Sequence, residues 1–163
     1  MNMKLQYTVA IATLALIFSG CSNGPRPIHY GEENGAYCKM GISDNRYGAE
    51  LITDKGKTYA FDSVECLASF YLEDGVPKTD VASLWVTDFQ NPPALIKVED
   101  AFFLLSDNLR SPMGMNLTAF SYAIGKDAVG NAFSGEIIGW NEVLGKVEQH
   151  LADARHPHGS IDS

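Results

Sequence analysis

Hydrophobic and polar positions in the first half of the chain predict two strands, a helix and a third strand. Val64, Leu67 and Tyr71 recur at the spacing of one helical face. Asp62 is the expected N-cap of that helix, and Glu65 three residues later completes a capping-box pattern. Period-two alternation and strand-favouring residues mark the strands, at Ala49–Thr53, Lys57–Phe61 and Ser83–Thr87.

The second half repeats this order of elements after a break at Asn91-Pro92-Pro93, through which no regular element passes comfortably. The expected elements are a strand at Phe102–Leu105, a strand at Thr118–Tyr122, a helix at Lys126–Asn131 and a strand at Gly135–Trp140. Asn141 is expected to cap a last helix that ends near Ala154. The pattern predicts an α+β protein of two ββαβ units with small, mostly antiparallel sheets. The units span residues 28–90 and 91–154, and residues 155–163 form a flexible tail.

The first 21 residues are typical of an export signal. Lys4 supplies a positive charge, Tyr7 to Phe18 form an apolar run, and Ser19-Gly20 precede Cys21. The small residues before Cys21 resemble a bacterial lipobox. The resemblance implies removal of residues 1–20, lipidation of Cys21, and a lipidated tether over residues 21–27. The expected location is therefore the bacterial cell envelope, with the domain held by lipid on a membrane that faces the periplasm. An ordinary signal and a soluble secreted protein are the alternative.

Charge and cysteine content narrow the function further. The chain has 20 acidic and 12 basic residues, a formal net charge of −8. This balance argues against nucleic-acid partners and against a basic membrane-docking patch. If Cys21 carries lipid, Cys38 and Cys66 remain. They can form a disulfide, bind a metal or lie buried as small apolar side chains.

All three methionines after residue 20 lie in two short motifs, Tyr37-Cys38-Lys39-Met40 and Ser111-Pro112-Met113-Gly114-Met115. Thiolate and thioether sulfurs are soft ligands that select Cu(I) over hard cations. In an extended segment, the i, i+2 spacing of each motif places both sulfur-bearing side chains on one side. The motifs predict a Cu(I) site. The alternative is that these methionines fill gaps in the core.

The residues predicted to bind copper are Cys38, Met40 and Met113. Further candidates are Cys66, His29 and Met115. A helix N-terminus favours a thiolate at Cys66, although Asp62 and Glu65 oppose that effect, and burial as a small side chain is the competing reading. His156 and His158 fall in the expected tail, where no defined geometry is expected.

The lipobox and three motifs together resemble the NosL family. The motifs are Tyr37-Cys38-Lys39-Met40, Phe61-Asp62-Ser63-Val64-Glu65-Cys66 and Ser111-Pro112-Met113-Gly114. The resemblance implies a copper-binding lipoprotein, not an enzyme, that delivers Cu(I) to nitrous oxide reductase or to its copper-loading transporter machinery. It also implies a fold of paired ββαβ units related to that of organomercurial lyase. Family members often read C-x-x-C-x-M, and the first of those cysteines corresponds to Gly35 here.

Two other functions are also compatible with the sequence. One is a general copper scavenger of the envelope without a dedicated client. The other is a metal–carbon lyase, with Cys38 and Cys66 as thiolates and Asp62 as proton donor. The sequence has no Gly-rich phosphate loop, no H-E-x-x-H and no G-x-S-x-G motif.

Overall fold

The computed structural model describes residues 24–155, so Cys21, His156 and His158 lie outside the described residues. The strands are β1 (Ala49–Thr53), β2 (Thr58–Phe61), β3 (Val81–Thr87), β4 (Leu95–Lys97), β5 (Ala101–Leu105), β6 (Leu117–Ser121) and β7 (Glu136–Ile138). The helices are α2 (Val64–Leu72), α3 (Lys126–Phe133) and α4 (Trp140–Arg155). Short 3-10 turns cover Lys78–Asp80, Val98–Asp100 and Tyr122–Ile124. Within the described range, no helix is long and apolar enough to cross a membrane.

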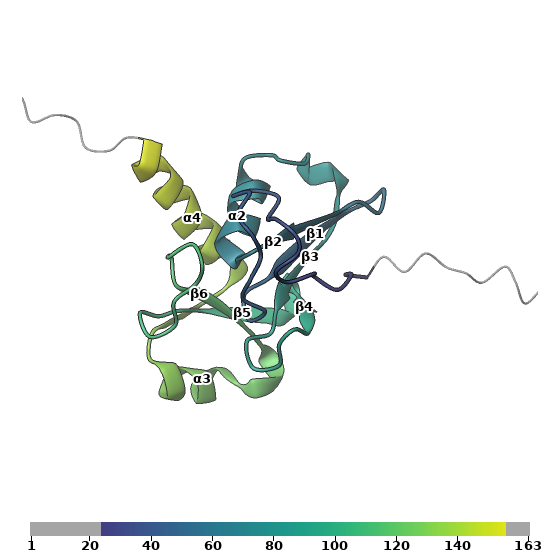
Figure 1. The fold of residues 1–163 in the computed structure, drawn as a ribbon. Helices are drawn as coiled ribbons and strands as arrows, with labels where there is room; N and C mark the ends of the chain where they lie inside the picture. The colour runs from purple at the N-terminus through teal and green to yellow at the C-terminus, as the bar shows by residue number, and fades with distance from the viewer. Residues whose placement is uncertain (1–23, 156–163) are drawn as a thin grey trace, which may run out of the picture.

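Two small antiparallel sheets organise these elements (Figure 1). The first has the strand order β2-β1-β3-β4, and the second has the order β6-β5-β7. The α+β class and the two ββαβ sequences of elements are confirmed. One strand was not predicted: β4 is a three-residue segment after the Pro92-Pro93 pair, and it joins the first sheet because Lys97 pairs with Trp85 of β3.

Both predicted helix caps are wrong. Ser63 is the N-cap of α2, and its hydroxyl accepts a hydrogen bond from the Cys66 amide at 3.3 Å. Asp62 is not available as the cap because its carboxylate lies against Cys38 instead. Asn141 lies inside α4, which begins one residue earlier. There the Glu142 carboxylate accepts the Gly139 amide at 2.8 Å and satisfies a donor just before the helix.

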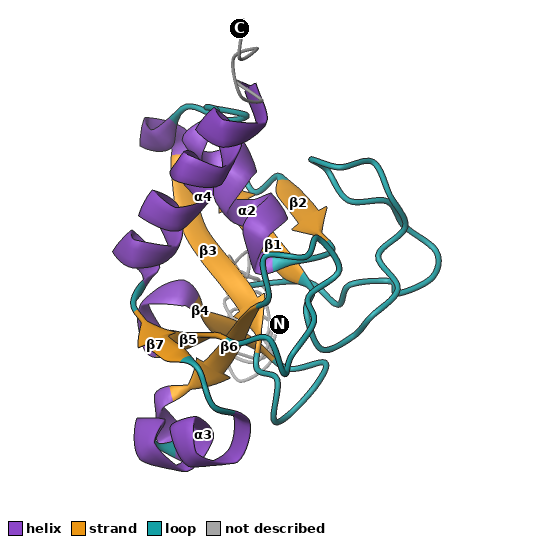
Figure 2. Ribbon diagram, turned by 90° about the vertical axis from the view of Figure 1, so that its left-hand side faces the viewer, coloured by secondary structure: helices purple, strands orange, loops and turns teal. Residues whose placement is uncertain are grey.

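One main core joins the two sheets. Helices α2 and α4 pack against each other beside the first sheet, whereas α3 lies at the other end of the molecule (Figure 2). Fully buried residues of this core come from both ββαβ units and α4, among them Phe61, Leu67, Val86, Phe103 and Val143. Burying one such side chain stabilises the fold by about 1.5–3 kcal/mol. The start of α2 is therefore fixed by packing from both units.

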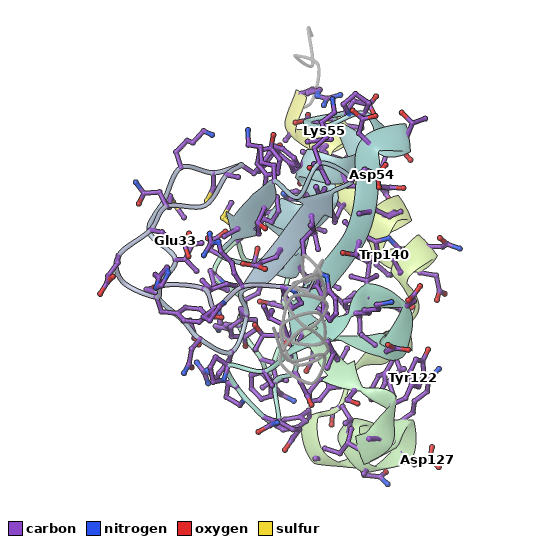
Figure 3. The ribbon with its side chains drawn as sticks, turned by 90° about the vertical axis from the view of Figure 1, so that its right-hand side faces the viewer. Glu33, Asp54, Lys55, Tyr122, Asp127 and Trp140 are labelled. Carbon is purple, nitrogen blue, oxygen red and sulfur yellow. The ribbon has the colours of Figure 1, made fainter. Side chains whose placement is uncertain are left out.

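The long segment before β1 is held against the first sheet by charged contacts. Arg26 forms an ion pair with Glu33 at 2.6 Å, and its amide donates to the buried Glu50 of β1 at 3.1 Å. Burial raises the pKa of the Glu50 carboxyl to about 7. Figure 3 shows Glu33 on this loop, across the molecule from Trp140 at the start of α4. These contacts fix the loop that carries Cys38.

Candidate metal centre

Cys38 on the first loop meets Asp62 and Cys66 at the start of α2. The sulfur atoms of Cys38 and Cys66 and a carboxylate oxygen of Asp62 all lie within 4.8 Å of one another. Both cysteines are free thiols, so the disulfide between them is not formed in this structure. Within residues 24–155, this is the one cluster of three or more Cys, His, Asp or Glu side chains with metal-binding proximity.

A tight turn in the first loop presents Cys38. The Gly35 amide bonds to the Met40 carbonyl at 2.8 Å, and the Lys39 amide bonds back to the Gly35 carbonyl at 3.1 Å. Lys39 adopts a positive φ of 64°, which closes the turn. The Met40 amide then donates to the Cys38 sulfur at 3.4 Å. The backbone thus points Cys38 inward and supplies one donor to its sulfur.

The start of α2 presents Asp62 and Cys66. Asp62 directly precedes the N-cap Ser63, and Cys66 lies in the first turn of the helix, where its amide donates to the Ser63 hydroxyl. Cys66 is buried within the main core. Burial, and then the neighbouring Asp62 carboxylate, raises the pKa of the Cys66 thiol above its ordinary value. A soft metal ion would reverse this effect, because coordination drives the loss of the thiol proton.

Asp62 has unused bonding capacity in this cluster. Its Oδ1 accepts a hydrogen bond from the Cys38 thiol at 3.4 Å. Its Oδ2 is buried and has no hydrogen-bond partner among residues 24–155. A buried carboxylate oxygen without a partner is costly, and such groups are typical of functional sites. From sequence, Asp62 is predicted as a site residue in the lyase alternative and not among the copper ligands. Its place four residues before Cys66, at the predicted helix start, is the signal that could have indicated it.

Gly35 borders the cluster directly. A Cβ atom at this position would lie 3.1 Å from the Cys38 sulfur and 3.7 Å from the Asp62 Oδ1 atom. This is the position where the C-x-x-C-x-M pattern has its first cysteine. The glycine therefore removes one sulfur donor from the edge of the cluster and leaves Cys38 and Cys66 as its two thiols.

The methionines differ in their surroundings. Met40 is 49% exposed and Met113 is 37% exposed, which is unusual for large apolar side chains. Neither methionine therefore serves as core filler. Met115 is partly buried and packs against the main core, as the alternative reading of methionine expects.

The methionine loop, residues 106–116, is fastened to the same helix turn as Cys66. The Ser111 hydroxyl donates to the buried Glu65 carboxylate, and Glu65 is the neighbour of Cys66 in α2. Met113 thus lies on a loop bonded to the residue next to Cys66. His29 is not brought into the cluster: it begins a turn in which its carbonyl accepts the amides of Glu32 and Glu33.

Comparisons with known proteins give a family match and a similar solved structure. The NosL family model matches residues 27–147. Among solved structures, the copper chaperone NosL from Shewanella denitrificans is similar, with a TM-score of 0.60 and 23% sequence identity. The alignment covers 74% of this chain and 95% of that one. At this identity the likeness establishes the shared fold. No curated protein matches the sequence.

Proposed function

The chain belongs to the NosL family, and we propose that it binds Cu(I) and delivers it as a copper chaperone. The observation that carries this proposal is the meeting of the two free thiols of Cys38 and Cys66 in one cluster. A thiolate sulfur binds a metal such as zinc at about 2.3 Å, so two sulfurs on opposite sides of one ion lie roughly 4.6 Å apart. The separation of at most 4.8 Å between the ligand atoms is compatible with both sulfurs binding one such ion.

The ligand types favour Cu(I) over other metals. Structural zinc sites almost always use four ligands in a closed tetrahedron. Here two thiols meet in one cluster, and two exposed thioethers lie on the loops that carry Met40 and Met113. Soft sulfur donors of this kind select Cu(I). We assign the thiols of Cys38 and Cys66 as the inner pair of ligands, with Met40 and Met113 as ligands from the solvent side. Exposed thioethers suit transfer, because an incoming partner can replace them one at a time.

The client is proposed to be nitrous oxide reductase or its copper-loading transporter machinery. Copper-loaded protein mixed without oxygen with either apo partner is expected to lose its copper to that partner. Metal analysis after separation by size measures the transfer, and an unrelated apo protein serves as the control. Retention of copper in the presence of both partners would contradict delivery and favour the general envelope scavenger.

The protein is proposed to work from a membrane surface, with Cys21 as its lipid anchor. Cys21 precedes Arg26, which contacts Glu33 and Glu50, by only five positions. A lipid on Cys21 would therefore hold the domain close to the bilayer, within reach of a membrane transporter.

One observation favours a second function, the metal–carbon lyase. The structure brings together the three residues that such an enzyme would use, with Asp62 against Cys38. In that reaction the thiolates hold mercury and Asp62 gives its proton to carbon as the metal–carbon bond breaks. Exposed methionines have no role in this step, which makes the chaperone the better account. Release of methane from methylmercury by the original protein, but not by Asp62→Asn, would support the lyase.

A further inference from the structure

Glu65 is a buried acid that neither the copper cluster nor the helix cap uses. It is only 3% exposed and lies in the first turn of α2. Its Oε1 atom accepts the Ser111 hydroxyl and, at 3.4 Å, the amide of Leu117. Burial raises the pKa of this carboxyl above its ordinary value. Placing an acid here is costly, and its two partners indicate what it does.

The two partners of Glu65 lie on either side of the two methionines in sequence. Ser111 and Leu117 stand at the two ends of the stretch that contains Met113 and Met115. A single carboxylate oxygen therefore fixes both ends of this stretch. Because Glu65 precedes Cys66 directly, the attachment point is one residue from a proposed copper ligand.

Between these two attachment points, Ser111 also determines the shape of the turn. Its hydroxyl accepts the Asn116 amide at 2.9 Å, and its carbonyl accepts the Gly114 amide at 3.1 Å. Gly114 and Asn116 both have positive φ, at 82° and 61°. Met113 occupies the exposed turn between Ser111 and Gly114. Its position depends on the Ser111 hydroxyl, which donates to Glu65 and accepts from the Asn116 amide.

We infer that Glu65 is a positioning residue, which acts through Ser111 to fix the turn that presents the Met113 thioether as a copper ligand. The inference rests on the proposed copper site and adds to it a residue that contacts no metal. Outer partners that orient a ligand typically contribute about 10- to 100-fold to metal affinity. The Glu65–Ser111 contact is the outer partner of Met113.

The test is a thermodynamic cycle of Cu(I) affinity with Ser111→Ala, Met113→Leu and the double variant. Ser111→Ala is expected to weaken binding about tenfold or more. In the Met113→Leu background the same change is expected to have almost no further effect, because residues that act as a unit are not additive. Affinity is measured by anaerobic competition with a Cu(I) chelator.

Three further variants separate the positioning of Met113 from a general loosening of the methionine loop. Ser106→Ala is the matched control, since Ser106 lies in the same loop and is 4% exposed, against 6% for Ser111. Its hydroxyl donates to the Phe133 carbonyl at 3.1 Å rather than to Glu65. It is expected to leave affinity unchanged. Glu65→Gln keeps an acceptor oxygen and is expected to retain most of the affinity that Glu65→Ala loses.

The outcomes distinguish this inference from the proposed function. If Met113→Leu weakens binding and Ser111→Ala does not, the positioning role is overturned and the copper site stands. Additive effects of the two changes would also overturn the positioning role. If Met113→Leu itself binds Cu(I) as tightly as the original, Met113 is not a ligand and both proposals about it are overturned.

Discussion

Replacing Cys38 with serine is expected to lower the affinity for Cu(I) by about 100-fold or more. The change deletes one of two thiols in the cluster and leaves Cys66 with a carboxylate, a poor donor for soft copper. Outer partners alone typically contribute about 10- to 100-fold, so a direct thiolate ligand should contribute at least the upper value. Anaerobic competition with a Cu(I) chelator measures the effect.

The fold of Cys38→Ser should change little, because Cys38 lies on a partly exposed turn at the edge of the core and serine is of similar size. The apo melting temperature is therefore expected to stay close to the original, while the copper-induced rise is lost. Met115→Leu is the control, since it also deletes a sulfur but from a side chain that packs on the core. It should keep the copper-induced rise. Equal rises in Cys38→Ser and the original would remove Cys38 from the site.

Replacing Cys21 with serine is expected to move the protein from the membrane fraction to the soluble fraction. Cys21 is the proposed point of lipid attachment. The lipidated cysteine is proposed to carry the acyl chains that hold the protein on the membrane, and stable anchoring requires more than one such chain. Loss of this cysteine removes them, so nearly all of the protein should be released. Fractionation of cells that express each variant measures the distribution.

Ser22→Ala is the matched control for the anchor, because it changes the next residue and keeps the cysteine. It is expected to stay in the membrane fraction. If Cys21→Ser stays there as well, the N-terminal segment has been misinterpreted as a lipoprotein signal.

Much of the fold was predictable because its strands and helices have local signals. The strand at Ala49–Thr53 has the bounds predicted for it, and most other elements differ by one or two residues. β4 was missed because three residues after a proline pair carry no periodicity. The N-cap moved from Asp62 to Ser63 for a tertiary reason, the contact of Asp62 with Cys38. The capping preferences of the residues around Asp62 do not predict its contact with Cys38.

The candidate site was predictable only in part. The motif with Cys38 and Met40 can be recognised as a candidate metal site by its sulfur-containing residues, and so can the loop with Met113. The approach of Cys66 and Asp62 to Cys38 joins residues 24 or more positions apart, and it depends on how the first loop folds over α2. The bond between Glu65 and Ser111 spans 46 positions. Nothing in the periodicity of either segment predicts these two contacts.

X-ray absorption at the copper edge, on the anaerobic domain from Ser22 onward loaded with one equivalent of Cu(I), tests the central claim most directly. We expect Cu(I) to be surrounded by sulfur. Cys38 and Cys66 should be the short-bonded thiolates, and the thioethers of Met40 and Met113 should be further neighbours. Met113→Leu should lower the sulfur count without changing the short thiolate distances. A spectrum with only nitrogen and oxygen neighbours would contradict the copper site proposed here.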